Sequence, residues 1–144
     1  MDTDNDKRYR ISVKALVLNQ TRDKFLVVLE KSGRWDLPGG GLEHGESYDA
    51  CLRREIEKEE MQVGLLYVAP EPCYFFTGQF LNPERRGQWY ANIVYEVVLE
   101  SLNFTPSSEC EEILFVSPQE VSNLLVFDSV ASLALQFRKE NHAA

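Results

Sequence analysis

Acidic side chains recur at helical spacing within residues 47–61 of the chain. At about 100° per residue, Glu55 and Glu59 fall beside the apolar stripe of the expected helix, whereas Glu57 and Glu60 fall on its solvent side. Like charges one turn apart repel, and burying them is costly unless a positive charge pairs with them. The inner pair therefore suits either a salt bridge with a basic side chain or a divalent cation, and helix geometry alone favours the salt bridge.

Three consecutive glycines, Gly39, Gly40 and Gly41, directly precede this helix. A glycine loop at that place allows close backbone approach and offers carbonyl oxygens to a hard cation. No Lys-Ser or Lys-Thr pair follows the glycines, so the loop is not a P-loop. The chain has two histidines and no CxxC pair. A metal would therefore need oxygen ligands, which favours magnesium, manganese or calcium.

A longer pattern spans residues 35–62, which read WDLPGGGLEHGESYDACLRREIEKEEMQ. This segment resembles the Nudix box, G-x5-E-x7-R-E-U-x-E-E-x-G-U, in which U is a bulky aliphatic residue. The positions that match are Gly40, Glu46, Arg54, Glu55, Ile56 and Glu59. A match at this many fixed positions is far more specific than a lone glycine motif.

The resemblance implies metal-dependent cleavage of a pyrophosphate linkage in a nucleoside diphosphate that is joined to another group. It assigns Mg²⁺ or Mn²⁺ to Glu55, Glu59 and the Gly40 carbonyl. The same two glutamates and Arg54 become the catalytic residues, with Arg54 orienting the carboxylates through charge-assisted hydrogen bonds. Glu46 would support the metal through a bound water.

Family members often recruit a further glutamate, as base or metal ligand, from a loop before a late strand. The acidic cluster Ser-Ser-Glu-Cys-Glu-Glu of residues 107–112 offers Glu109, Glu111 and Glu112. We favour Glu109 as the additional metal ligand. The competing interpretation is a plain solvated acidic turn.

Lys58, Met61 and Gln62 depart from the box. Lys58 stands where the first glutamate of the E-E pair belongs, and its ammonium would reach Glu55 at spacing i+3. It would then replace a second metal and attenuate turnover, which keeps open a non-catalytic or weakly active nucleotide-binding module. A one-residue slip would instead pair Glu59 with Glu60, but it needs a π-bulge in the helix. We therefore expect the unslipped register.

The sequence indicates the residues that contact the substrate less clearly than the residues of the box. Arg85 and Arg86 lie in an expected hairpin loop and are candidates for a phosphate contact, the alternative being an exposed hairpin tip. Aromatic side chains on the expected strands are candidates for stacking on a base; they are Phe75, Phe76, Trp89 and Tyr90. Strand aromatics more often belong to the core. Of the four, Tyr90 is our candidate for substrate binding.

The elements that must position these residues follow from hydrophobic alternation and turn signals. Strands are expected at residues 9–19, 25–31, 65–68, 73–80, 88–99 and 113–116, with a loop at 32–46. One helix is expected at 47–61, a second begins at the capping box of residues 117–120, and a third is expected at the C-terminal end. The predicted fold is α+β, a Nudix-like α/β/α sandwich with helices on both faces of a mixed sheet. Residues 9–140 would form one domain after a flexible segment, 1–8.

Composition limits the remaining possibilities. With 144 residues and a formal net charge of −8, the chain suits a small phosphorylated ligand, and no nucleic-acid partner is expected. The same negative charge disfavours the hypothesis that the substrate is the 5′ end of an RNA. No stretch has the apolar length of a membrane helix, and the polar start is not a signal peptide. We expect a cytoplasmic monomer or homodimer without membrane contact.

Overall fold

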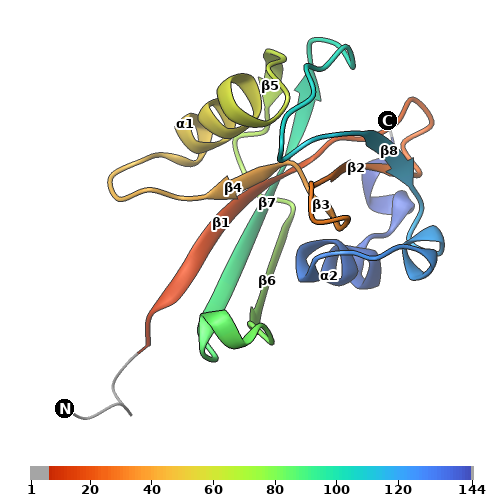
Figure 1. Cartoon of the computed structure of the whole chain (residues 1–144). Helices are drawn as coiled ribbons and strands as arrows, with labels where there is room; N and C mark the ends of the chain where they lie inside the picture. Colours follow the sequence, from red (N-terminus) through yellow and green to blue (C-terminus); the bar gives the residue numbers. More distant parts are fainter. Residues whose placement is uncertain (1–6, 144) are drawn as a thin grey trace.

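The computed structural model describes residues 7–143 (Figure 1). The expectation of a flexible N-terminal segment falls mainly on residues 1–6, which lie outside the described residues. Within residues 7–143, no helix has the length and apolar character needed to cross a membrane.

The larger sheet has five strands built around a long central one. The central strand is β7 (Trp89–Leu99), which runs parallel to β1 (Tyr9–Leu16). On the far side of β1 lies β4 (Gly39–Gly41), antiparallel to it. The other edge of β7 pairs antiparallel with β6 (Tyr74–Gln79) and, further along, with β5 (Leu65–Val68).

A second sheet of three strands has the order β3 (Trp35–Asp36), β2 (Phe25–Leu29) and β8 (Ile113–Val116), all antiparallel. The residues expected to form a loop at 32–46 therefore contain two short strands, β3 and β4. Both are brief because glycine and proline interrupt the segment. This arrangement confirms the mixed sheet and the α/β/α sandwich.

The first helix begins at Ser47, whose Oγ accepts a hydrogen bond from the backbone N–H of Ala50 at 3.1 Å. It runs as α1 (Tyr48–Leu52) and continues without a break as a π-helical segment, η2 (Arg53–Glu60). The C-terminal helix is α2 (Asp128–Gln136). Figure 1 shows α1 and α2 on opposite sides of the larger sheet.

Short 3₁₀ helices complete the fold, namely η3 (Pro83–Arg85), η4 (Glu120–Asn123) and η5 (Lys139–His142). The capping box makes both of its hydrogen bonds: Ser117 N–H to the Glu120 carboxylate, and Glu120 N–H to the Ser117 hydroxyl. The helix expected there is nevertheless only the 3₁₀ turn η4, because Leu124 returns to extended backbone.

Two apolar clusters hold the layers together. On one face of the larger sheet, Leu52 and Ile56 of the first helix pack against β1 and the far half of β7. On the other face, Val130 and Leu133 of α2 pack against β2, β6 and β8. All four of these side chains are fully buried. The sheet is thus fixed between the two helices, and the glycine strand β4 lies beside the start of α1.

Candidate functional site

The glycine strand β4 lies against the edge of β1 and the side chains of the first helix. Gly39 has a φ of +113°, and a side chain there would collide with the carbonyl oxygen of Val13. A Cβ on Gly40 would lie 2.5–2.7 Å from the carboxyl atoms of Glu55. Because these positions carry no side chain, the Glu55 carboxylate rests directly on the loop backbone.

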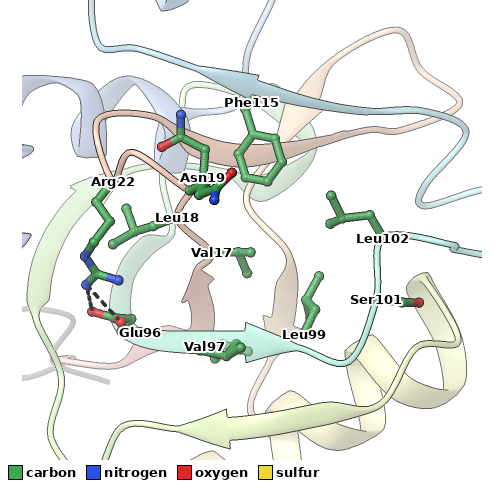
Figure 2. A pocket seen from close by; sticks show the side chains of 12 residues that line it. Val17, Leu18, Asn19, Arg22, Glu96, Val97, Leu99, Ser101, Leu102 and Phe115 are labelled. Carbon is green, nitrogen blue, oxygen red and sulfur yellow. Dashed lines mark hydrogen bonds and ion pairs between the residues drawn. The ribbon is translucent and has the colours of Figure 1, made fainter. Parts of the chain in front are cut away.

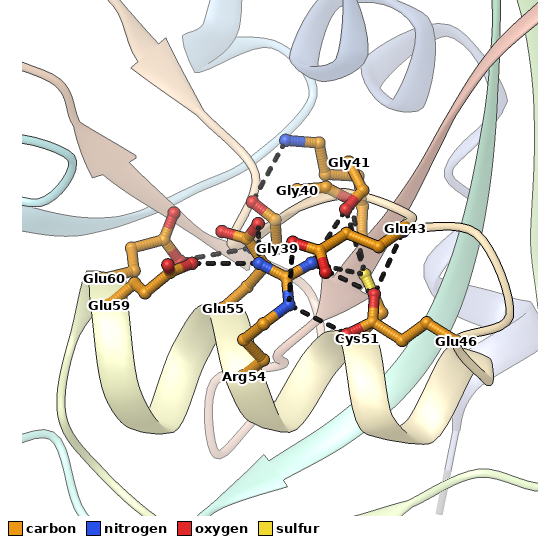
Figure 3. Close-up of polar contacts among 11 residues, drawn as sticks. Gly39, Gly40, Gly41, Glu43, Glu46, Cys51, Arg54, Glu55, Glu59 and Glu60 are labelled. Carbon is orange, nitrogen blue, oxygen red and sulfur yellow. Dashed lines mark hydrogen bonds and ion pairs between the residues drawn. The ribbon is translucent and has the colours of Figure 1, made fainter.

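Arg54 is the centre of the polar contacts in Figure 3. Its Nε and Nη2 donate to the two oxygens of Glu46 at 2.8 and 3.0 Å. Nη1 donates to Glu55 Oε1 at 2.9 Å and to Glu59 Oε2 at 3.0 Å. Nη2 also donates to the carbonyl oxygen of Gly41 at 2.9 Å. One guanidinium therefore ties the glycine loop to three carboxylates, and its hydrogen bonds lower the pKa of Glu46 to about 2.

Glu60 does not face solvent, so the prediction from ideal helix geometry is wrong at this position. Its side chain is only 4% exposed, and its Oε1 accepts a hydrogen bond from the Gly39 N–H at 3.2 Å. The reason is the π-helical segment η2, which closes with i to i+5 hydrogen bonding from Met61 N–H to the Ile56 carbonyl. In a π-turn, residues five apart lie one above the other, so Glu60 joins Glu55 on the inner side.

The π-helical segment accommodates one extra residue in the box. When Lys58 is treated as the insertion, Glu59 and Glu60 take the E-E positions and Val63, which is buried, takes the final aliphatic position. Gln62 then stands at the box glycine, and its φ of +58° is the left-handed conformation that favours glycine. The box with one inserted residue therefore fits the structure both at its E-E pair and at its final glycine and aliphatic positions.

Two further expectations for this helix are corrected. Lys58 is exposed and, within residues 7–143, forms no ion pair, so its ammonium does not neutralise Glu55. Arg54 does so instead. Glu57 is half-buried: its Oε2 accepts from the Leu65 N–H at 2.9 Å and from Arg53 at 3.2 Å. Glu57 thus fastens the end of the helix to β5.

Lys14 is a residue of the site that sequence reasoning missed. It lies on β1 and is 7% exposed, and its Nζ contacts Asp36 Oδ2 at 3.2 Å and the carbonyls of Leu37 and Gly39 at 3.4 Å. Burial lowers its pKa, but Asp36, Glu60 and Glu55 outweigh burial and raise it. A lysine among the otherwise apolar residues 13–18 was the available signal.

The contacts of Lys14 extend to α2. Asp36 Oδ1 accepts a hydrogen bond from the hydroxyl of Ser129 at 2.6 Å. Because Ser129 is buried at the start of α2, this bond connects the second helix to the carboxylates. A continuous polar chain therefore runs from Glu60 and Lys14 to Asp36 and Ser129.

Acidic groups outnumber basic ones at the site. Burial raises the pKa of Glu55, and Glu59 and Glu109 add to this by repulsion, while Arg54 opposes it. Burial raises the pKa of Glu60 well above its ordinary value, with Lys14 opposing and Asp36 and Glu109 contributing. Glu109, the favoured member of the acidic cluster, therefore lies within electrostatic reach of both glutamates.

The carboxylates are engaged by protein partners in this conformation. In the part of the chain that the structure describes, no three acidic, histidine or cysteine side chains converge as a ready metal-binding group. Arg54 gathers Glu46, Glu55 and Glu59, and Glu60 is turned to the backbone of Gly39.

The remaining candidates lie on β6, on β7 and in the turn between these two strands. Arg85 and Arg86 are exposed in the turn between β6 and β7, at the end of the sheet remote from α1 (Figure 1). Phe75 and Trp89 are about half exposed, whereas Phe76 belongs to the core beneath α2. Tyr90 is buried on the α2 side of β7, next to Phe80. The structure thus does not bring the two arginines to the glycine loop.

A cavity of about 270 Å³ lies at the other end of β1 and β7 (Figure 2). Its walls are mostly apolar, and an ion pair between Arg22 and Glu96 stands at one side. None of the box residues lines it. We do not assign it to the site around Arg54.

Comparisons with known proteins show the family and the fold. The NUDIX domain family matches residues 8–135, which is most of the chain. A curated relative is the nucleoside triphosphatase NudI of Escherichia coli O139:H28 (strain E24377A / ETEC), with 27% identity over 93 residues. The matched region covers 62% of this chain and 65% of NudI, so the chain spans slightly less than two thirds of the length of that relative.

Solved structures share the fold. The MutT protein from Methanosarcina mazei Go1 superposes with a TM-score of 0.68 at 23% identity, covering 94% of this chain and 97% of that one. The E. coli dihydroneopterin triphosphate pyrophosphohydrolase superposes with a TM-score of 0.60 at 16% identity, covering 91% and 97%. At such identities the likeness establishes the fold alone.

Proposed function

We propose a hydrolytic function for this chain, which belongs to the Nudix family: it cleaves the pyrophosphate linkage of a nucleoside diphosphate that carries a further group. The observation that carries this proposal is the convergence of Glu46, Glu55 and Glu59 on Arg54, beside the glycine loop. The burial of Glu60 on the same side of the helix supports it.

The donors at the site fit a hard divalent cation. They are carboxylate and carbonyl oxygens, the ligands that Mg²⁺ and Mn²⁺ prefer. The absence of a side chain at Gly40 leaves room for the Glu55 carboxylate against the loop. We assign Glu55, Glu59, Glu60 and the Gly40 carbonyl as ligands, with Glu109 as a further one. When bound, such an ion neutralises phosphate charge and lowers the pKa of a bound water.

The protein's own cations have a separate role. Arg54 fixes the orientations of Glu46, Glu55 and Glu59, which lowers the entropy that these side chains lose when ligand binds. Lys14 holds Asp36 and the carbonyl of Gly39 from beneath. Both cations also offset repulsion among the carboxylates before a substrate arrives.

The family, a curated relative and a structural neighbour support the substrate class that we propose. NudI is called a nucleoside triphosphatase, and a structural neighbour is a dihydroneopterin triphosphate pyrophosphohydrolase. In both, a ring system carries a polyphosphate. We propose that this chain takes small nucleotides of that kind in the cytoplasm, and its net charge of −8 disfavours nucleic acid as the substrate.

A panel of nucleotide pyrophosphates tests the proposal directly. Nucleoside triphosphates, nucleotide sugars, ADP-ribose and dinucleoside polyphosphates are incubated with the protein and Mg²⁺ or Mn²⁺, and released phosphate is measured with and without a coupling phosphatase. We expect turnover of at least one class, its loss with EDTA and its recovery with added metal. Turnover that survives thorough chelation, or none at high protein concentration, refutes the proposal.

The sequence left open a non-catalytic nucleotide-binding module because Lys58 replaces a box glutamate. In the structure Lys58 is exposed, and Glu60 takes up the inner side of the helix. No observation now favours the binding module over the hydrolase.

A further inference from the structure

Asn92 differs from every other buried polar residue among residues 7–143. Five such side chains are at most 7% exposed, namely Lys14, Glu60, Asn92, Ser129 and His142. Four of them have hydrogen-bond partners in the protein. The amide of Asn92, which is 5% exposed, has no partner in the described part of the chain.

The unpaired amide remains open to a narrow approach from outside. Within residues 7–143, no polar side-chain atom is both completely enclosed and without a partner. The amide atoms of Asn92 therefore keep a small accessible area, although the residue as a whole is 95% covered. An amide that is desolvated to this degree without a partner costs folding free energy. A hydrogen-bond partner from outside the protein, such as a ligand, would offset this cost.

Strand register places Asn92 beside the polar chain of the site. Its Cα partner on β1 is Ser12, and Lys14 is paired with Val94. Since side chains two apart share a face, Asn92 lies on the same face as Lys14, which contacts Asp36. That face is the one covered by α2.

Aromatic side chains flank the amide. Phe76 is the Cα partner of Asn92 on β6, and Tyr90 lies two residues away on the same face. Both rings are buried. A planar amide with aromatic residues at neighbouring positions of the same face suits a flat heterocycle, because a ring can contact its face and the amide can pair with its edge.

We propose that Asn92 is a specificity-determining residue that reads the edge of the substrate's nucleobase. Its amide oxygen accepts from a ring or exocyclic N–H of the base, and its NH₂ group donates to an adjacent ring nitrogen or carbonyl. Ser12, the Cα partner of Asn92 on β1, lies beside it on the same face. The inference rests on the proposed function for the position of the phosphates, but not for the base contact itself.

Binding of AMP, GMP, CMP and UMP, measured by calorimetry, tests the contact without requiring hydrolysis. We expect the wild-type affinities for the four bases to differ by about tenfold or more, since a paired edge discriminates at that level. Asn92→Leu should compress the four affinities to within about twofold. Asn92→Asp, which exchanges donors for an acceptor, should change their order.

Folding stability separates this role from a structural one. Because Asn92 has no protein partner to lose, Asn92→Leu should unfold at the same denaturant concentration as wild type or at a higher one. Asn103→Leu replaces an exposed asparagine of a loop and should leave the base preference intact. A wild-type protein that binds all four nucleotides equally, or an Asn92→Leu variant with the wild-type spread, overturns the proposal.

Nucleotide binding and pyrophosphate cleavage, measured together, separate a failure of the base contact from a failure of the hydrolase. Base-selective binding that depends on Asn92, together with no cleavage of any pyrophosphate, would refute the hydrolase and preserve the base contact. Cleavage whose kcat/KM ranks the nucleoside triphosphates identically in wild type and Asn92→Leu would preserve the hydrolase and refute the base contact.

Discussion

Glu60 accepts a hydrogen bond from the backbone N–H of Gly39 at 3.2 Å, although an ideal α-helix would turn its side chain to solvent. The contact connects the end of the first helix to the beginning of the glycine loop. It exists because η2 is π-helical, so that its hydrogen bonds join residues five apart and not four apart as in an α-helix. The departures of the chain from the Nudix box therefore have a geometric explanation in a single inserted residue.

Deleting Lys58 tests the insertion. The deletion converts the i to i+5 relationship of Glu55 and Glu60 into i to i+4, so an ordinary α-helix would present the same carboxylates. We expect ΔLys58 to fold, to be at least as stable as wild type, and to retain pyrophosphate hydrolysis. Chemical denaturation and the activity panel provide the measurements.

Deletion of Ala50 is the matched control for ΔLys58. Ala50 is exposed in α1, but its loss rotates every later residue of the helix by about 100° relative to the cap. We expect this variant to lose both stability and hydrolysis. Equal behaviour of the two deletions would show that the extra residue is not accommodated at Lys58.

Glu57→Gln separates helix anchoring from chemistry. Glu57 accepts from the Leu65 N–H and from Arg53, away from the glycine loop. Loss of the charge-assisted bonds should lower the free energy of unfolding by about 1 kcal/mol, with kcat unchanged. Urea denaturation measures the change in the free energy of unfolding, and steady-state kinetics measure kcat. A fall in kcat at full stability would place Glu57 in the site.

Lys14→Met should be among the most damaging single substitutions. It removes the ion-pair partner of Asp36 and leaves buried carboxylates uncompensated, which typically costs about 3–5 kcal/mol. Lys14→Arg should recover part of the loss, because it keeps the charge but not the shape. Guanidinium unfolding of both variants gives the measurement. A Lys14→Met protein as stable as wild type would contradict the role given to this ion pair.

We predict that the protein loses stability in mild acid because His142 is buried. Burial lowers its pKa, with Glu96 opposing and Arg22 reinforcing, and its Nε2 lies 2.6 Å from the Tyr74 hydroxyl. The unfolded chain then binds more protons than the folded one between the lowered pKa and about 6.5. Stability is complete above that value and falls as pH drops through the window.

Asn serves as the replacement at His142 because it does not titrate in this range. Urea denaturation at pH 7.5 and pH 5.5 should show a larger loss of stability for wild type than for His142→Asn. An equal loss in the two proteins would remove His142 as the cause.

Much of the site could be predicted from the sequence, because the types of its residues and their spacing indicate it. The glycine loop and the strands that hold the site follow from local patterns, and the resemblance to the Nudix box implied the placement of Arg54 among carboxylates. Local periodicity, however, assumes 3.6 residues per turn. It therefore placed Glu60 outside and sent Lys58 to Glu55, and neither holds in a π-helical segment.

Other features depend on contacts between distant parts of the chain. Lys14 and Asp36 are 22 positions apart, and Ser129 is 93 positions from Asp36. No spacing rule along the sequence links them. The isolation of Asn92 is likewise visible only once the partners of its neighbours are known. Such relationships arise from tertiary packing, which pattern reasoning does not reach.

The most direct test of the account is the hydrolysis rate of Glu60→Gln, measured at saturating Mg²⁺ and Mn²⁺ beside Glu57→Gln. The substrate is the best nucleotide of the panel, and folding is verified by denaturation. We expect a loss of at least about a hundredfold for Glu60→Gln, with Glu57→Gln retaining the wild-type kcat. A Glu60→Gln protein that hydrolyses the nucleotide at the wild-type rate would contradict the assignment of Glu60 to the site.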